Sequence, residues 1–349
     1  MSMWSIERRP WTARPSGEIG LPDTSPRRNN AVDHWASPPH SPRVIPGVWP
    51  RGVLKTSCLK PYWKRRVSTD MCRWLAYAGS PISLEELLYK PVNSLVMQSK
   101  HSRLGVETTN GDGFGVGWYG ALDTPGIYHS AEPAWNDRNL RELSAQAAAG
   151  RVFAHIRAST GSAVQQTNCH PFRHGRWLWM HNGAIGDFPT VKRDLTLAVE
   201  PTLFPEIEGS TDSELFFFLA LTFGLEEDPP GAVARAVGLI EATGQRHGIQ
   251  YPIQMTVATT DGETTWAFRY SSEGRSRSLF HSADVTTIRH QYPENPVLHD
   301  LSDDARLVVS EPLGDLRGAW REVPESTCLV VQGGREELRE FSPLAQATG

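Results

Sequence analysis

The order of the predicted elements constrains the fold of this chain most strongly. Runs typical of strands come first, two apolar runs typical of helices follow at residues 215–225 and 231–244, and period-two strands then return. Regular strand–helix alternation, which would indicate a parallel sheet, is missing from this order. The sequence therefore predicts an α+β fold of layered antiparallel sheets and helices, with Asp261-Gly262 as the turn of a C-terminal hairpin.

Local patterns predict further elements in the first half of the chain. Residues 72–78 and 151–157 are predicted as strands, and residues 140–149 as a helix. Ser83 begins a short helix through a capping box. An apolar strand over residues 177–181 leads into Asn-Gly, a pair typical of hairpin turns.

Composition changes near residue 70 of the 349. Residues 1–70 hold 12 Lys and Arg against 5 Asp and Glu, whereas the remainder holds 23 against 34. With 10 of the 26 prolines and no hydrophobic period, residues 1–70 are predicted to be a disordered basic extension. Three explanations of this extension are open: an early start codon, a removable pro-segment or a functional tail. Residues 71–349 are predicted as the globular domain. Because the basic residues are scattered, no nucleic-acid partner is expected.

The sequence also indicates a compartment and excludes some partners. No run approaches the roughly 18 apolar residues of a membrane helix, and the N-terminus has no apolar signal-peptide core. We therefore expect no membrane partner and a cytoplasmic location. Neither a disulfide framework nor a metal site is expected, because the spacing of the cysteines and of the central histidines matches no standard pattern. These residues are Cys58, Cys72, Cys169, Cys328, His155, His170, His174 and His181.

Met71-Cys72 is the first candidate for chemistry. If the mature chain begins at Cys72, one residue carries both a thiol and a free α-amine. An α-amine with a pKa of roughly 7.7–8.0 can accept the proton of a thiol whose pKa is roughly 8.5. Nucleophile and base are then held together covalently, and no separate histidine is needed. A buried structural cysteine is the alternative.

A cysteine that attacks a carbonyl needs donors for the developing oxyanion. Asn182 and Gly183 fit this need, because a side-chain amide and a glycine N–H can point at one oxygen. A simple hairpin turn is the alternative for this pair.

Two charged residues could bind the ends of a free amino acid. Arg157 ends a strand with a buried pattern, so it needs an anion, either an internal carboxylate or a substrate α-carboxylate. Asp212 begins a helix, where it could bind a substrate α-ammonium or act as an N-cap beside Thr211 and Glu214. Together the two residues would form a zwitterion clamp.

Two further motifs are weaker candidates. Asn110-Gly111-Asp112-Gly113 precedes a strand rather than a helix, which argues against a phosphate-binding loop. Cys169 next to His170 resembles a Cys–His pair, but neighbouring residues of an extended segment point to opposite faces.

Six motifs, in this order, make residues 71–225 resemble the class II glutamine amidotransferases of the N-terminal-nucleophile fold. The residues of the second motif, 112–119, resemble the stand-alone branch of this family, which includes the γ-glutamyl hydrolase of ergothioneine synthesis. The motifs are Met71-Cys72-Arg73-Trp74-Leu75, Asp112-Gly113-Phe114-Gly115-Val116-Gly117-Trp118-Tyr119, His155-Ile156-Arg157-Ala158-Ser159-Thr160, Asn168-Cys169-His170-Pro171-Phe172, His181-Asn182-Gly183 and Thr211-Asp212-Ser213-Glu214.

The resemblance implies a four-layer αββα sandwich with Cys72 as nucleophile on a central strand, and no cofactor. It implies Asn182 and Gly183 as the oxyanion hole and Arg157 and Asp212 as ligands of the substrate's carboxylate and ammonium. Thr160, the last residue of its motif, is also expected at the substrate.

One feature departs from the family. Residues 1–71 precede the nucleophile, and while they remain attached the α-nitrogen of Cys72 is an amide that cannot act as a base. A smaller departure is Gly161, where synthase-linked members often carry His.

These inferences lead to hydrolysis of a γ-glutamyl amide through a γ-glutamyl-thioester on Cys72 as the expected reaction. The small-molecule substrate is glutamine or a γ-glutamyl metabolite. One alternative is a glutaminase that supplies ammonia to a separate synthetase partner. The sequence also leaves open a catalytically silent binding module, if the extension is retained, and an amidase for non-glutamyl amides.

Overall fold

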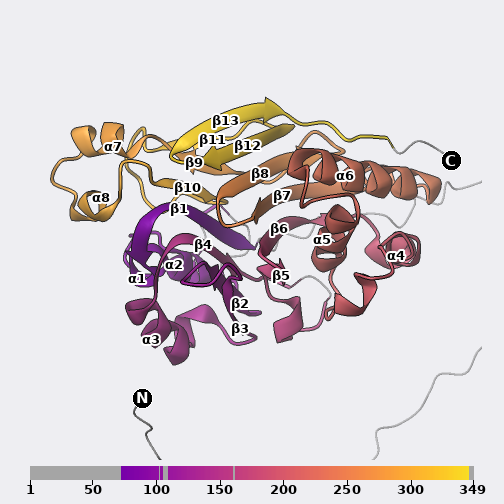
Figure 1. The fold of residues 1–349 in the computed structure, drawn as a ribbon, viewed down its shortest axis with the longest axis horizontal. Coiled ribbons are helices and arrows are strands. Elements are labelled where there is room, and N and C mark those ends of the chain that lie inside the picture. Colours follow the sequence, from indigo (N-terminus) through magenta and orange to yellow (C-terminus); the bar gives the residue numbers. More distant parts are fainter. Residues whose placement is uncertain (1–71, 102, 105–108, 160–161, 346–349) are drawn as a thin grey trace, which may run out of the picture. The chain divides into compact units, whose positions relative to one another are not determined.

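The computed structural model describes residues 72–101, 103–104, 109–159 and 162–345 (Figure 1). All of them belong to one compact unit. The predictions for residues 1–70 and for Thr160 lie outside the described residues. Within these ranges, no helix is long and apolar enough to cross a membrane.

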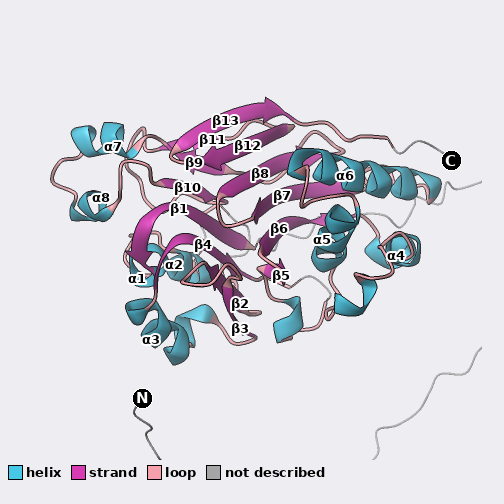
Figure 2. Cartoon of the chain, viewed as in Figure 1, coloured by secondary structure: helices cyan, strands magenta, loops and turns pink. Residues whose placement is uncertain are grey.

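The first sheet has the strand that follows Cys72 near its centre, with antiparallel pairing throughout (Figure 2). Its register places Trp74 of the central strand opposite His155 of the neighbouring strand. The seven described strands are, in spatial order, β11 (Trp320–Glu322), β9 (Phe280–Ser282), β10 (Arg306–Val309), β1 (Arg73–Ser83), β4 (Ala148–Ile156), β2 (Phe114–Trp118) and β3 (Gly126–Ser130).

The second sheet is also antiparallel, and its neighbours in space are largely neighbours in sequence. The described strands are, in order, β13 (Arg335–Glu340), β12 (Thr327–Gln332), β8 (Thr264–Ser271), β7 (Ile253–Thr260), β6 (Trp177–Ile185) and β5 (Phe172–His174). The predicted hairpin is confirmed, because β7 and β8 are joined through Asp261 and Gly262, and Gly262 has φ +93°.

An apolar layer joins the two sheets. Trp74 and Phe153 from the first sheet share one buried cluster with Leu178, Met180 and Leu329 from the second. Burial of such side chains contributes roughly 1.5–3 kcal/mol each relative to exposure. The packing holds β1 against β6, the two strands that border the candidate nucleophile.

Helices cover the outer face of each sheet (Figure 1). The first sheet packs against α1 (Leu84–Leu88), α2 (Leu95–Lys100), α3 (Arg138–Gln146), α7 (Val285–Gln291) and α8 (Pro296–Asp300). The second packs against α4 (Phe188–Thr196), α5 (Asp212–Thr222) and α6 (Pro229–Arg246). Short 3-10 turns are η1 (Ala134–Asn136), η2 (Gln166–Asn168) and η3 (Phe204–Glu206). The described residues thus form the four-layer αββα sandwich that the family resemblance implied, and the α+β prediction is confirmed.

Two local predictions were wrong. The helix predicted over residues 140–149 ends at Gln146, because residues 148 and 149 pair with the end of β1. Asn182 and Gly183 form no turn: they continue β6 and pair with Thr256 and Met255 of β7. A turn preference of two residues is overridden here by a full ladder and by apolar packing on both sides of the strand.

Candidate active site

Cys72 lies immediately before β1, at the start of the central strand, and is partly exposed. Its sulfur contacts the backbone of Ala158, which follows β4. The Ala158 N–H donates to Sγ at 3.3 Å, and the thiol donates to the Ala158 carbonyl oxygen at 3.4 Å. The nucleophile predicted from the sequence is therefore held between the ends of two paired strands.

The surroundings of the thiol have opposing effects on its acidity. Burial raises the pKa of Cys72, whereas the Ala158 N–H and the positive charges of Arg277, Arg157 and Arg73 lower it. Because burial is the largest effect, the neutral thiol is favoured in this state. A thiol of this kind needs a base to become a nucleophile. Arg277 was not identified from the sequence, because it lies in a loop between β8 and β9 without a distinguishing motif.

Asn182 connects β6 to the candidate nucleophile. Its Nδ2 donates to the carbonyl oxygen of Cys72 at 2.8 Å, and its Oδ1 lies 3.0 Å from His155 Nε2. Burial lowers the pKa of His155 to about 3, so the ring is neutral and a proton on Nε2 fits the contact with Oδ1. The amide is thus fixed from both sides, and one N–H of Nδ2 is left for a further acceptor.

Gly183 occupies a position that excludes any side chain. Its φ is +152°, and an added Cβ would lie 1.9 Å from the Gln254 carbonyl oxygen and 2.6 Å from His181 Nε2. The absence of Cβ lets this backbone lie directly beside β7 next to Asn182.

Arg157 directly precedes Ala158 and is 4% exposed. Its guanidinium donates to the Asp112 carbonyl oxygen at 3.2 Å and to the hydroxyls of Ser159 and Ser162 at 3.1 and 2.6 Å. All these acceptors are neutral, and no carboxylate among the described residues forms an ion pair with Arg157. The internal carboxylate partner that the sequence left open is therefore not found in this part of the chain.

Asp212 is the first residue of α5, but it is not the N-cap. Thr211 caps the helix, because its hydroxyl accepts from the Glu214 N–H at 3.2 Å. Oδ2 of Asp212 accepts from the Ile185 N–H at 2.8 Å, and Oδ1 accepts from the Ser213 N–H at 2.8 Å. The N-cap alternative for Asp212 was wrong, because the preceding hydroxyl takes that role.

The helix start is also tied to the strand that carries Asn182. The hydroxyl of Ser213 lies 2.9 Å from His181 Nδ1 and donates to Asp212 Oδ1 at 3.3 Å. Asn182 thus lies between two residues of β6, His181 and Ile185, that bind the start of α5. Cys72, Asn182, Gly183, Arg157 and Asp212 are therefore brought together by four elements far apart in sequence: β1, β4, β6 and α5.

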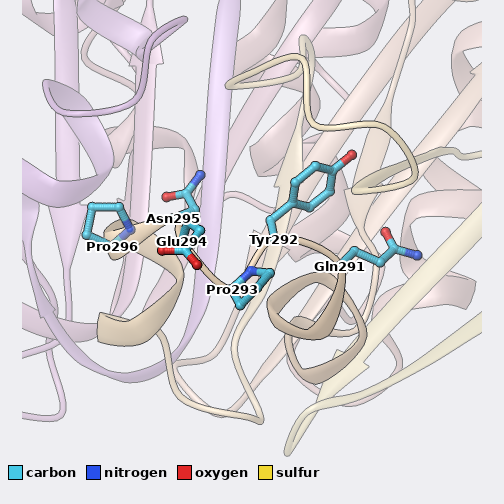
Figure 3. A pocket seen from close by; sticks show the side chains of 6 residues that line it. All are labelled: Gln291, Tyr292, Pro293, Glu294, Asn295 and Pro296. Carbon is cyan, nitrogen blue, oxygen red and sulfur yellow. The ribbon is translucent and has the colours of Figure 1, made fainter.

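The remaining candidate groups form no comparable arrangement. Cys169 donates to the carbonyl oxygens of Ser130 and Gln165 at 3.4 and 3.5 Å. Neither ring nitrogen of His170 has a hydrogen-bond partner among the described residues, so no Cys–His pair forms there. Within the described ranges, no three His, Cys, Asp or Glu side chains are grouped to hold a metal ion. The cavity in Figure 3 is lined by the consecutive residues 291–296 and includes none of the candidate residues.

Comparisons with known proteins show the family to which the chain belongs. Residues 92–346 match the family of class II glutamine amidotransferases. The chain is 35% identical to the probable glutamine amidotransferase DUG3 of Saccharomyces cerevisiae, over 75% of this chain and 82% of the relative. It is 28% identical to the γ-glutamyl-hercynylcysteine sulfoxide hydrolase of Mycolicibacterium smegmatis, over 69% of this chain and 99% of that protein.

Solved structures show the same similarity. A glutamine aminotransferase class II domain protein from Silicibacter pomeroyi superposes with a TM-score of 0.58 and 31% identity, over 78% of this chain and all of that one. Glutamine phosphoribosylpyrophosphate amidotransferase of Bacillus subtilis has a TM-score of 0.52 at 14% identity, over 78% of this chain and 50% of that one, which shows a shared fold. The chain therefore belongs to the class II glutamine amidotransferases, a family of enzymes that hydrolyse amide bonds.

Proposed function

We propose that this enzyme hydrolyses a γ-glutamyl amide, glutamine or a γ-glutamyl metabolite, through a γ-glutamyl-thioester on Cys72. The observation that carries the proposal is the buried guanidinium of Arg157, which has neutral acceptors and precedes the residue that holds the Cys72 sulfur. A buried cation is costly without an anion, the described residues supply none, and a substrate carboxylate would neutralise the charge. Asp212 is the proposed ligand of the α-ammonium.

The proposed reaction has two steps. The thiol proton passes to the α-amine of Cys72, and the sulfur attacks the δ-carbonyl carbon while Asn182 Nδ2 and the Gly183 N–H donate to the oxyanion. The carbon–nitrogen bond breaks as the α-ammonium returns a proton to the leaving nitrogen. The α-amine of Cys72 then takes a proton from water, whose oxygen attacks the thioester. The thiolate recovers this proton, and glutamate and the free thiol are released.

This mechanism requires an unblocked nitrogen on Cys72. Removal of residues 1–71, or translation from Met71 followed by loss of that methionine, would supply it. A retained extension would leave an amide at this position, and the protein would then be a binding module that keeps the clamp.

Glutamate release tests the proposal. The chain is expressed at full length, its amino terminus is determined, and glutamate is measured with L-glutamine and with a γ-glutamyl dipeptide as substrates. We expect release without any partner protein, and none from Cys72→Ala. Turnover of glutamine that begins only when a synthetase is added would favour the ammonia-donor alternative. The sulfoxide hydrolase relative, 99% of which is covered by the alignment, favours independent hydrolysis.

A further inference from the structure

Cys72 lies outside the regular strand pairing and is held by other means. The pairing of β1 with β4 begins at Arg73 and Ile156, so the residue before Arg73 has no ladder partner. Its carbonyl oxygen instead accepts two side-chain hydrogen bonds, from Asn182 Nδ2 at 2.8 Å and from Arg73 Nη1 at 3.0 Å. Fixing this carbonyl fixes the peptide plane to which the Cα of Cys72 belongs, and the contacts with Ala158 hold the sulfur itself.

The guanidinium of Arg73 is in turn held by a buried carboxylate. Arg73 is 3% and Glu311 2% exposed, and Arg73 Nε donates to Glu311 Oε2 at 2.9 Å. Glu311 follows β10, in the C-terminal third of the chain, where the sequence suggested no residue for the chemistry. Each charge neutralises the other, so both can be buried next to the nucleophile.

Glu311 is rigidly placed by further donors. Its Oε1 accepts from Asn93 Nδ2 at 3.0 Å and from the Arg103 N–H at 3.1 Å, and its Oε2 also accepts from the Leu104 N–H at 3.2 Å. A carboxylate held by donors from two segments can hold a guanidinium in one orientation.

We propose that Arg73 and Glu311 are positioning residues of the reaction: the buried Glu311 carboxylate orients the Arg73 guanidinium, which fixes the Cys72 carbonyl oxygen and with it the peptide plane that carries the nucleophilic residue. The inference rests on the proposed role of Cys72. The planar guanidinium of Arg73 binds the Cys72 carbonyl oxygen and a Glu311 carboxylate oxygen at once, and the single ammonium of a lysine cannot do this in the same geometry. Their proposed role is to position the nucleophile and not to bind substrate, so kcat depends on them and KM does not.

The first experiment measures kcat and KM for L-glutamine hydrolysis in Arg73→Lys and Glu311→Gln, with the chain expressed at full length and its amino terminus determined. We expect each change to lower kcat about 10–100-fold, because misplacement by a fraction of an ångström suffices. KM should stay within about twofold, since Arg157 and Asp212 are unchanged.

A matched control removes a neighbouring ion pair that does not reach the nucleophile. Arg103 Nη1 donates to both carboxylate oxygens of the exposed Asp315, at 2.7 and 2.8 Å. Asp315→Asn should keep wild-type kcat. Equal behaviour of Glu311→Gln and this control would overturn the proposal.

A double-variant cycle separates positioning from a general role of Glu311 in holding Arg103 and Leu104. If Glu311 acts through Arg73, Arg73→Met with Glu311→Gln should have a kcat no lower than Arg73→Met alone. Losses that multiply would contradict the proposal. Arg73→Lys supplies the test if the Glu311 variants do not fold, because it keeps the buried charge.

The pH dependence of iodoacetamide alkylation at Cys72 gives a readout that loose packing would not produce. Arg73 is one of the positive charges that lower the pKa of this thiol. Arg73→Met should therefore move alkylation to higher pH, whereas Arg73→Lys should leave the profile in place and still lower kcat. A wild-type kcat in both Arg73→Met and Arg73→Lys contradicts the proposal. Activity retained in Cys72→Ala would instead refute the proposed function itself.

Discussion

At the scale of single residues, the sequence predicted what Arg157 requires but did not predict which residues bind it. A guanidinium at the end of an apolar strand needs an anion, and this requirement could be read from the sequence. Its acceptors Asp112, Ser159 and Ser162 could not, because they depend on the path of two loops. The same holds for Glu311, whose partner Arg73 is 238 residues away in sequence.

Replacement of Arg157 tests the carboxylate clamp. Arg157→Ala should lower kcat/KM for γ-glutamyl substrates about 10–100-fold, since a charged hydrogen bond contributes roughly 1.5–3 kcal/mol. Arg151, in the strand β4 that Arg157 follows, donates to backbone oxygens of Gly79 and Gly150 and serves as the matched control. The measurement is kcat/KM of Arg157→Ala and of Arg151→Ala. A small effect of Arg157→Ala would favour an amidase for non-glutamyl amides.

Gly183→Ala tests the tight packing beside Asn182. The added Cβ would lie 1.9 Å from the Gln254 carbonyl oxygen, so β6 or β7 must shift. We expect a stability loss of about 1–3 kcal/mol and loss of activity. Gly120→Ala is the control, because an added Cβ meets no atom within 4 Å there. Urea unfolding and activity assays of both variants should differ; equal behaviour would mean that the close packing has no importance.

At the scale of elements, apolar runs predicted helices α5 and α6 and the strands β1, β4 and β6 because their core faces are continuous, whereas α2, α4, α7 and α8 were not predicted. Helix α5 is an example: seven apolar residues in a row, 215–221, are all buried. The turn predicted at Asn182-Gly183 was wrong, because a local turn preference carries no information about the strand that pairs with these two residues. The elements around the site were therefore largely predictable, whereas the register that aligns them was not.

Thr211→Ala tests the start of α5, the element that presents Asp212. Loss of the hydroxyl that accepts from the Glu214 N–H should cost about 1 kcal/mol. Thr211→Ser keeps the acceptor and should stay close to wild type. The free energy of unfolding in urea distinguishes the two variants, and an equal loss in both would show that the cap is unimportant.

At the scale of the whole molecule, two sheets and two helical layers leave several histidines buried or partly buried, and neutral. Burial lowers the pKa of His129 to about 4 and that of His155 to about 3. The unfolded chain binds protons at these side chains below about pH 6.5, whereas the folded chain does not. Protonation of these groups therefore does not lower the free energy of unfolding above pH 6.5, and it lowers this free energy progressively as the pH decreases toward 4.

His129→Gln tests this dependence away from the nucleophile. Glutamine can still donate to the Pro171 carbonyl oxygen that His129 Nε2 contacts at 3.1 Å. Between pH 7 and 5, the variant should lose about 2 kcal/mol less stability than wild type. Urea titrations at both pH values provide the measurement, and parallel losses would contradict the assignment of a neutral His129.

The domain boundary near residue 70 and the cytoplasmic location stay predictions, and the start of the mature chain decides whether the proposed chemistry can occur. The most direct measurement is mass spectrometry of the active protein after reaction with 6-diazo-5-oxo-L-norleucine, an electrophile that mimics glutamine. We predict a chain that begins at Cys72 and carries one adduct on its sulfur. An active protein that retains residues 1–71, or an adduct on another residue, would contradict the proposed mechanism.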